Sequence, residues 1–247
     1  MDPVVDEAVC LRQWDFSETS QTAVLFTSKL GIVRVLGKGT KRNDPRFSGG
    51  LEVGTLGEAV IYPKETGLAT LAGWDLRRTF RESRRSLASH HAVMFALDLP
   101  RHLLSEDEPH ARAFEGLVAT LDALGRLDWR PVIAGWLWHV LDEAGYRPDL
   151  SAGGDDGRPV RGFSPERGRL VAEDDPDRGV IWEIQPGTAA ALRSIASGEA
   201  VADDQAERAG RLLAWYVREI AGREPPTMPP LFGRFDPSAV VRDATNR

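Results

Sequence analysis

The first 75 residues alternate short apolar runs with turn residues, a pattern typical of β-strands. β-Branched and aromatic residues dominate the runs, and Gly, Ser, Asn and Pro separate them. Five short strands can bury their apolar faces by closing into a small barrel, and the OB-fold is the commonest such barrel that binds nucleic acid. An SH3-like barrel has a similar pattern and stays open as an alternative. The expected strands are 8–14, 22–27, 32–36, 56–62 and 67–74, with a hairpin turn at Lys29-Leu30-Gly31.

After residue 79 the apolar spacing becomes helical. We expect a first helix within residues 81–104 that Pro100 ends or kinks, and a second that begins at Glu108-Pro109 with the proline at its first position. Asp128 caps a third helix, and Gly145 stands where that helix stops. Three successive apolar faces predict a helical bundle. The first face is expected to hold Leu87, Val93, Met94, Leu97, Leu103 and Leu104.

Residues 147–180 interrupt the helical pattern, because they are rich in Gly, Asp, Pro and Arg and poor in apolar side chains. This stretch predicts a small irregular module or a long loop. Helices then resume: Thr188 caps one and Asp203 caps a longer one, and the Pro-rich tail from Glu224 is expected to be extended. The predicted fold class is therefore α+β. A five-stranded OB-type barrel domain spans residues 1–80, and a helical domain spans 81–247 with an inserted irregular module at 147–182.

Composition limits the class of protein. The chain has 247 residues, of which 42% are hydrophobic, enough for one large domain or two small ones. A single cysteine, Cys10, excludes a disulfide within the chain and favours a reducing compartment. There is no run of about 18 apolar residues that could span a membrane. The acidic start lacks the features of a signal peptide. We therefore expect a cytoplasmic protein without a membrane partner.

The net charge of −6 is unevenly distributed. Residues 1–90 hold 13 Lys and Arg against 11 Asp and Glu, whereas the remainder is strongly acidic. Within the first part, residues 29–46 carry six cations and one acid, and residues 77–85 carry five cations and one acid. Phosphate binding depends on such local clusters and not on the charge of the whole chain.

Motifs for catalysis or nucleotide binding are missing. Gly37-Lys38-Gly39-Thr40-Lys41 lacks the upstream glycine of a phosphate-binding P-loop, and Ser164 is not in a Gly-x-Ser-x-Gly turn. No histidine has a second ligand at zinc-motif spacing, and Cys10 is expected to be a buried strand residue. The acid pairs at 155–156 and 174–175 are interpreted as solvated, with a weak divalent-cation site left open. We predict no enzyme, no cofactor and no metal.

The positive signal is the segment 38–47, which lies between two predicted barrel strands. Its glycines allow close approach to a ligand, its cations can follow a phosphate chain, and Phe47 can offer a face to a base. The alternative is a solvated basic loop with Phe47 tucked against the barrel. The predicted DNA contacts are Lys38, Lys41, Arg42 and Arg46, with Arg34 beside them and Arg77 and Arg78 extending the path.

The sequence resembles the RecO family of bacterial recombination mediators over nearly its whole length, up to about residue 232. The residues that carry the resemblance follow the family's order and spacing, and they are specific only in combination. They are Asp6-Glu7-Ala8-Val9-Cys10-Leu11-Arg12, Leu25-Phe26-Thr27-Ser28-Lys29-Leu30-Gly31, Gly37-Lys38-Gly39-Thr40-Lys41-Arg42, Arg46-Phe47-Ser48-Gly49-Gly50-Leu51-Glu52, Ala144-Gly145-Tyr146-Arg147-Pro148-Asp149-Leu150, Gly162-Phe163-Ser164-Pro165-Glu166 and Leu212-Leu213-Ala214-Trp215-Tyr216.

This resemblance implies a protein that binds single- and double-stranded DNA, anneals complementary strands and works at the nucleoid. It implies RecR and the single-stranded DNA-binding protein as partners. The acidic C-terminal tail of the latter would dock on the helical domain, where Arg126 and Arg130 are candidates to meet its charge. Many relatives carry two Cys-x-x-Cys pairs that suggest a structural zinc. The matching positions here are Gly153, Asp156, Ala172 and Asp175, so no thiolate is present.

Two other functions compete with DNA binding. One is a protein-interaction module whose barrel binds no nucleic acid, which the acidic C-terminal two-thirds of the chain favours. The other is a hydrolase, which needs a catalytic constellation that the sequence does not contain. A salt-dependent shift of a labelled oligonucleotide separates the first from DNA binding.

Overall fold

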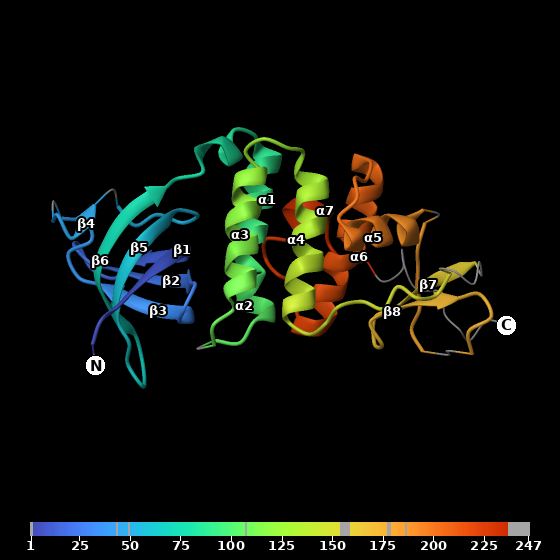
Figure 1. The fold of residues 1–247 in the computed structure, drawn as a ribbon, viewed down its shortest axis with the longest axis horizontal. Helices are drawn as coiled ribbons and strands as arrows, with labels where there is room; N and C mark the ends of the chain where they lie inside the picture. The colour runs from blue at the N-terminus through green and yellow to red at the C-terminus, as the bar shows by residue number, and fades with distance from the viewer. Residues whose placement is uncertain are drawn as a thin grey trace. The chain divides into compact units, whose positions relative to one another are not determined.

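A computed structural model describes residues 2–42, 44–48, 50–106, 108–153, 159–176, 179–185 and 187–236. The chain forms two compact units, Met1–Arg126 and Leu127–Arg247. The first contains the barrel and the helices α1 to α3, and the second contains α4 to α7 and a small sheet (Figure 1).

The barrel consists of β1 (Val4–Asp15), β2 (Gln21–Thr27), β3 (Gly31–Gly37), β5 (Leu56–Tyr62) and β6 (Ala69–Arg78). These strands pair in the order β3-β2-β1-β5-β6, and parallel pairing of β3 with β6 closes the ring. This is the five-stranded Greek-key barrel of the OB-fold, so the predicted α+β class with an N-terminal OB barrel is confirmed and the SH3-like alternative is excluded.

All five predicted strands are present, and β5 has the predicted bounds. The structure adds a two-residue strand that the sequence pattern did not reveal, β4 (Phe47–Ser48), which pairs with β6. The predicted hairpin turn is confirmed, and Gly31 at its end has a φ of 72°. A Cβ at this position would collide with the carbonyl of Glu108, so the close approach of the 108 backbone requires glycine.

The barrel core follows the period of two along each strand. Cys10, Leu25, Val35, Ile61 and Leu71 point inward and are almost completely buried. The Trp74 indole also lies in this core, packed so closely on β5 that a Cβ at Gly57 would overlap it. Burial of Cys10 raises the pKa of its thiol to about 12, which makes it a structural residue, as expected.

Helices cover part of the outer surface of the barrel within the first unit. The expected helix over 81–104 is divided into a short 3₁₀ helix η1 (Arg81–Arg84), α1 (Leu87–Asp98) and α2 (Pro100–Leu103). Pro100 is the first residue of α2, so the predicted break is confirmed. Leu87 is 71% exposed, and its assignment to the apolar face was wrong, because it is the first residue of α1 after the Ser86 cap.

The next helix, α3 (Ala111–Ala123), begins later than the Pro109 start that the sequence predicts. The preceding backbone is held by the barrel instead, because Ile32 forms a bridge with Glu106 and Glu108 contacts Gly31. Phe114 of α3 meets Phe26 of β2 edge to face, with ring centroids 5.7 Å apart. The tertiary contact therefore overrides the local helix-start signal.

The second unit is built on α4 (Trp129–Glu143), which packs against α6 (Asp203–Ala221) and α5 (Thr188–Ser197). The Asp128 side chain accepts from the backbone N–H of Arg130, and Gly145 ends the helix with a φ of 79°, both as predicted. Thr188 and Asp203 are not caps, because they are the first residues of their helices after Gly187 and Ala202. The tail is not wholly extended, since it contains α7 (Pro229–Phe232).

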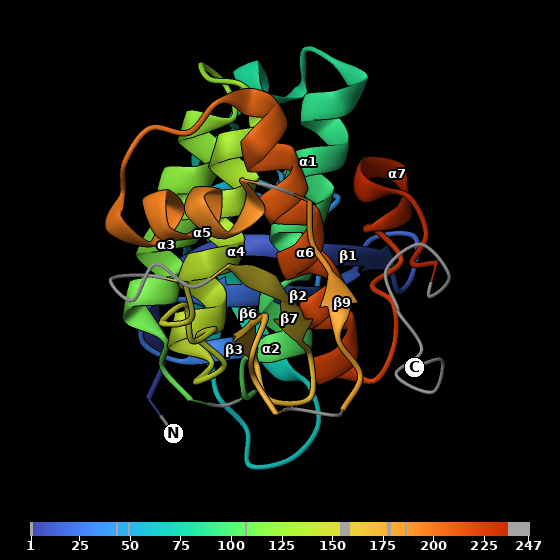
Figure 2. The same ribbon diagram turned by 90° about the vertical axis from the view of Figure 1, so that its right-hand side faces the viewer.

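The segment expected to be irregular contains a three-stranded antiparallel sheet of β7 (Val160–Ser164), β8 (Arg169–Ala172) and β9 (Trp182–Glu183) (Figure 2). The ring of Phe163 of β7 packs on two other aromatic rings. Its centroid lies 6.1 Å from that of Trp182 of β9 and 5.2 Å from that of Tyr216 of α6. The sequence concealed these strands because they are short and lie between Gly- and Asp-rich stretches. No helix within the described ranges is long and apolar enough to cross a membrane.

Candidate nucleic-acid interface

Residues 38–46, here called the basic loop, follow β3 and lead to β4. The loop turns at Gly39, which has a φ of 83°, and the N–H of Arg42 donates to the Gly39 carbonyl (2.9 Å). Lys38 and Arg42 are exposed, and neither forms an ion pair with any residue that the structure describes. These two cations are therefore free to bind phosphate.

The other two cations of the basic loop already hold carboxylates. The Nζ of Lys41 lies 2.6 Å from Oδ2 of Asp15 at the end of β1. Arg46 forms a bidentate pair with Asp44, in which Nη2 donates to Oδ2 (2.6 Å) and Nε to Oδ1 (3.1 Å). The Arg46 hydrogen bonds lower the pKa of Asp44 to about 2 and raise that of Arg46. Arg42 makes a smaller Coulombic contribution to the low pKa of Asp44.

The turn between β1 and β2 lies against the basic loop. The N–H of Lys41 donates to the Thr19 carbonyl (3.3 Å), which adds to the Lys41–Asp15 ion pair. This turn and the end of β1 expose two aromatic side chains, Trp14 (48% exposed) and Phe16 (63% exposed). Sequence reasoning did not select either residue. The alternation of β1 past its bulge at Cys10 and Arg12 could have indicated an outward Trp14.

Phe47, which the sequence offers as a surface for a base, is buried with 6% exposure. It is part of β4 beside Trp74, and its ring packs into the barrel core near Gly37. The N–H of Trp74 donates to the Arg46 carbonyl (2.7 Å), and this hydrogen bond fixes the backbone immediately before Phe47. The prediction that Phe47 offers its ring to a base was therefore wrong. The structure supports the alternative, in which Phe47 packs against the barrel.

Arg34 points outward from β3, and its Nη2 lies 2.7 Å from Oε1 of Glu106. Both side chains are about half exposed, so a phosphate can compete with this carboxylate. In register, Arg34 lies opposite Val24, which lies opposite Arg12. Arg12 is different from Arg34, because its guanidinium donates to the buried carboxylate of Asp98 on α1 (2.8 Å).

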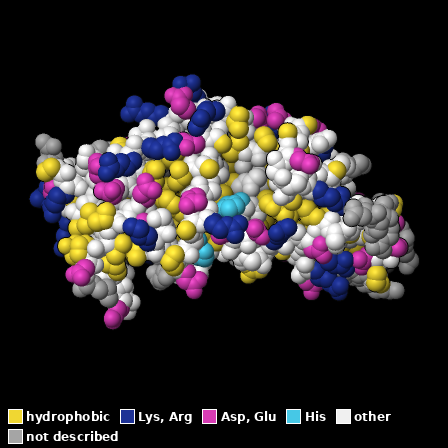
Figure 3. All heavy atoms as spheres, viewed as in Figure 1, with side chains coloured by type: hydrophobic (Ala, Val, Ile, Leu, Met, Phe, Trp, Pro, Cys, Tyr) yellow, Lys and Arg dark blue, Asp and Glu magenta, His cyan; other side chains and the backbone are white. Residues whose placement is uncertain are grey.

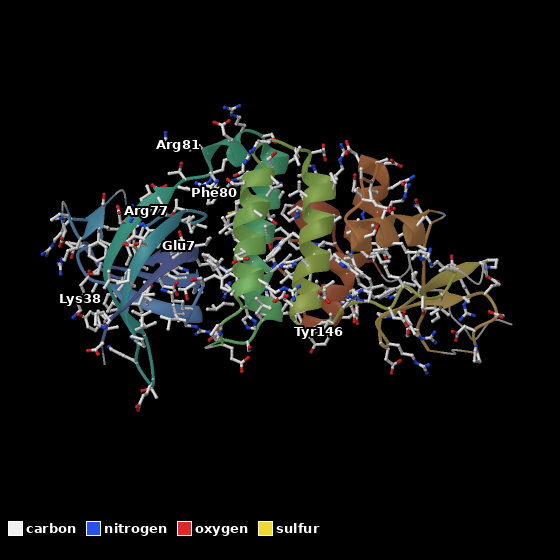
Figure 4. All side chains as sticks on the ribbon, viewed as in Figure 1. Glu7, Lys38, Arg77, Phe80, Arg81 and Tyr146 are labelled. Carbon is white, nitrogen blue, oxygen red and sulfur yellow. The ribbon has the colours of Figure 1, made fainter. Side chains whose placement is uncertain are left out.

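Arg77 and Arg78 lie near the end of β6. Leu71 of β6 pairs with Gly37, and Arg77 comes six residues later, roughly 20 Å from the start of the basic loop. Arg77 is only three residues, roughly 10 Å, beyond Trp74, whose N–H donates to the carbonyl of Arg46 at the other end of the loop. Figure 4 labels Lys38 and Arg77 on the barrel. Arg78 forms an ion pair with Asp122 of α3 and lies 4.8 Å from the ring centroid of Phe80. The structure thus groups four predicted contacts in the basic loop, and it places Arg77 and Arg78 further along β6, where carboxylates hold both; the role of all of them in DNA binding stays a prediction.

An acidic row crosses three strands near Arg77. Glu7 of β1 pairs in register with Glu58 of β5, and Glu58 pairs with Asp75 of β6. We call these three residues the acidic row. Arg77 is engaged there, with its Nη1 3.2 Å from Asp75 and its Nη2 3.5 Å from Glu58. Acidic and basic side chains are mixed on the face of the barrel shown in Figure 3.

Outside the barrel, the described residues offer no metal-binding set: no three His, Cys, Asp or Glu side chains are grouped so that they could hold an ion. The acid pair at 155–156 lies outside the described residues. Arg126, in the first unit, is exposed, whereas Arg130, in the second, donates to Asp128 (2.8 Å) and Asp203 (3.0 Å). The hydrogen bonds that Arg130 donates to Asp128 raise the pKa of Arg130, so this side chain stays charged and paired.

Comparison with known families accounts for almost the whole chain. The family described as "Recombination protein O N terminal" matches residues 1–80, and the one described as "Recombination protein O C terminal" matches residues 84–229. The chain belongs to the RecO family. RecO proteins act in DNA repair and recombination as mediators and are not enzymes. The boundary between the two family matches lies between residues 80 and 84. The boundary between the two compact units of the structure lies later, after Arg126.

Curated relatives carry the same family name. The DNA repair protein RecO of Anaeromyxobacter sp. (strain K) is 32% identical over 223 residues, covering 85% of this chain and 87% of its own. The DNA repair protein RecO of Rhodopirellula baltica is 36% identical over 122 residues, covering 49% of this chain and 44% of its own. The RecO protein of Prosthecochloris aestuarii is 23% identical over 219 residues, covering 87% and 80% respectively.

The inserted module of this RecO-family chain has an arginine contact at Asp175 and another next to Gly153, two of the four positions that match cysteines in many relatives. Arg169 of β8 holds Asp175 in a bidentate ion pair, with Nη1 2.7 Å from Oδ2 and Nη2 3.1 Å from Oδ1. Arg193 of α5 donates to the carbonyls of Leu150 (3.2 Å) and Ala152, next to Gly153. Ala172 is buried, and Asp156 lies outside the described residues. The Arg169–Asp175 pair holds β8 to the segment that follows it, and Arg193 ties the start of the module to α5, in both cases without a thiolate ligand.

Proposed function

We propose that this RecO-family protein binds single- and double-stranded DNA through the basic loop of its barrel. The observation that carries the proposal is the pair of free cations, Lys38 and Arg42, held in one turn beside exposed aromatic side chains. Lys and Arg contacts to phosphate release condensed counterions, so affinity depends on these local charges. The net charge of −6 of the whole chain does not oppose such a local contact.

The paired cations form the second part of the proposed interface. Lys41, Arg46 and Arg34 each face one carboxylate at the surface, and a DNA phosphate can replace that carboxylate. Exposed ion pairs are generally weak, so a phosphate can compete with the carboxylate for the cation, least so at Arg46, which Asp44 holds through two hydrogen bonds. Arg77 and Arg78 contact the DNA only if the DNA extends from the basic loop along β6.

We place DNA binding in residues 1–80 and partner binding in the helical domain at 81–247, which includes the inserted module at 147–182. We also propose annealing of complementary strands, loading of a recombinase with RecR and work at the nucleoid of the cytoplasm, and membership of the RecO family supports these roles. The acidic tail of the single-stranded DNA-binding protein is proposed to dock on the helices. Arg126 is the better candidate for its charge, since Arg130 already holds two carboxylates. A tail peptide that competes no better than a scrambled peptide contradicts this docking.

The test is a binding titration with labelled oligonucleotides of mixed sequence, single- and double-stranded, between 0.05 and 0.3 M salt. Single strands lose about 0.7 in log affinity per log unit of salt for each phosphate contact, so two to four contacts give a slope between about −1.4 and −3. Affinity is expected to be alike for different sequences, because phosphate contacts do not read bases. Absence of binding at the lowest salt contradicts the proposal.

The acidic row supports a second candidate function, a protein-interaction module that does not bind DNA. Glu7, Glu58 and Asp75 place three carboxylates across adjacent strands, and Arg77 pairs with the latter two. Such a surface suits a basic partner protein. Capture of a basic partner by a chain that binds no oligonucleotide at low salt would favour this function over the first.

A further inference from the structure

A band of five residues crosses the barrel strands and passes the end of β3, where the basic loop begins. The pairing registers connect the five in turn: Trp14 lies opposite Thr22, Thr22 opposite Leu36, Leu36 opposite Thr70, and Thr70 opposite Tyr62, which lies beside the other end of β1, where Ile61 pairs with Val4. We call these five residues the belt. Each belongs to a different barrel strand, and Lys38 comes two residues after Leu36.

The belt faces outward. Its neighbours along the strands, Ala23, Val35, Ile61 and Leu71, belong to the buried core, so strict alternation directs the belt side chains away from the interior. Helices do not bury it, since Trp14 is 48% exposed and Tyr62 is 40% exposed. At the other end of the same strands, by contrast, Phe26 is fully buried beneath Phe114 of α3.

The aromatic residues lie next to the proposed phosphate contacts. Asp15, which follows Trp14, holds Lys41 at 2.6 Å, and the turn containing Phe16 accepts the N–H of Lys41 through Thr19. Single exposed apolar side chains are ordinary at protein surfaces. Two exposed aromatic rings beside two unpaired cations are instead the combination used by surfaces that bind single strands, in which the groove charges follow the backbone and the rings receive bases.

We propose that Trp14, assisted by Phe16, is a base-stacking platform, so that the barrel prefers single-stranded to double-stranded DNA. This inference rests on the proposed DNA-binding function and specifies its ligand. In a duplex the bases are already stacked and paired, so only the phosphates are open to the basic loop. In a single strand a base can turn onto the Trp14 ring while neighbouring phosphates reach Lys38 and Arg42. Tyr62, at the end of the belt, offers a further ring to a longer strand.

The experiment compares Trp14→Ala and Trp14→Phe with the wild-type chain on a single strand, on a duplex of equal length and on an abasic single strand. Trp14→Ala is expected to weaken single-strand binding about tenfold, within the range of one lost stacking partner, and to leave the salt slope unchanged. Duplex binding is expected to change less than about twofold, and Trp14→Phe to restore most of the loss. Tyr146→Ala, which removes a ring of similar exposure from the second unit, is the matched control.

The abasic strand keeps the test decisive if Trp14→Ala does not fold. It has the same phosphates without bases, so wild-type protein is expected to bind it about tenfold more weakly than the normal strand. Equal affinity for the two strands, or equal losses on single strand and duplex in Trp14→Ala, overturns the stacking proposal. Failure of the DNA-binding function itself looks different, because wild-type protein then binds none of the three ligands at low salt.

Discussion

The basic loop and the acidic row both lie beside cations but leave them in different states. In the basic loop, Lys38 and Arg42 form no ion pair with any residue that the structure describes. On the side of the acidic row, Arg77 faces Asp75 and Glu58, and the nearby Arg78 is held by Asp122. A count of charges along the sequence treats these residues alike. The availability of a cation depends on the carboxylates that the fold places around it, and this separates a phosphate-binding surface from an internally neutralised one.

Removing the two free cations is expected to change DNA affinity more than any other substitution considered below. Lys38→Glu with Arg42→Glu deletes two phosphate contacts, which at 0.1 M salt corresponds to at least about 25-fold weaker single-strand binding. Single and double strands of every sequence are expected to lose affinity, because these contacts carry no base information. Fluorescence anisotropy measures the loss. Thermal unfolding within about 2 °C of wild type shows that the fold survives, since exposed loop charges contribute little to stability.

Freeing a paired cation is expected to have a smaller and opposite effect. Asp44→Asn removes the carboxylate that Arg46 holds, so Arg46 becomes available for one further phosphate. Affinity for a single strand is then expected to rise about fivefold at 0.1 M salt, with a salt slope steeper by about 0.7. Glu18→Gln, which removes an exposed charge from the β1–β2 turn, is a control for general repulsion. An equal gain in both variants contradicts a specific role of the Asp44–Arg46 pair.

The pH dependence of this gain follows from the low pKa of Asp44. The folded state lowers that pKa from 3.8 to about 2, so the ion pair is complete above pH 4 and is lost only as the pH falls towards 2. The ratio of Asp44→Asn to wild-type affinity is therefore expected to stay constant between pH 5 and 8. A ratio that falls towards 1 near pH 5, measured by the same titration, means that Asp44 titrates there and does not hold Arg46 as described.

The smallest expected effect concerns the acidic row. Glu7 and Glu58 are directly opposite on adjacent antiparallel strands, and like charges in this position are destabilising. Glu7→Gln is expected to raise the free energy of unfolding by about 0.5 kcal/mol, or about 1–2 °C in Tm, without a change in DNA affinity at moderate salt. A gain in DNA affinity comparable to that of Asp44→Asn places the acidic row beside the DNA and contradicts the assignment of the phosphate contacts to the basic loop alone.

Much of the fold was predictable because it depends on local patterns. Alternating apolar residues located all five barrel strands, and Asp128 and Gly145 located both ends of α4. Elements that depend on distant contacts were missed. β4 exists because Phe47 pairs beside Trp74, and α3 starts at Ala111 because the 106–108 backbone is held by β3.

The candidate site was predictable only in its location. The sequence grouped Lys38, Lys41, Arg42 and Arg46 in one loop, and the structure does the same. It could not show that Asp15, 26 residues before Lys41, neutralises it, because that contact requires the barrel to close. It selected Phe47 as the exposed ring when the exposed rings are Trp14 and Phe16. Both differences arise from strand register, which a local pattern does not determine.

The salt dependence of single-strand binding tests the central claim most directly, when measured on three chains side by side. These are the wild type, Lys38→Glu/Arg42→Glu, and Arg77→Glu/Arg85→Glu, whose net charge changes by the same amount on cations that already hold acids. We predict that the basic-loop variant has a log–log slope shallower than wild type by about 1.4, and that the Arg77/Arg85 variant keeps the wild-type slope. Equal slopes in the two variants, or a loss confined to the Arg77/Arg85 variant, would contradict the assignment of the phosphate contacts to Lys38 and Arg42.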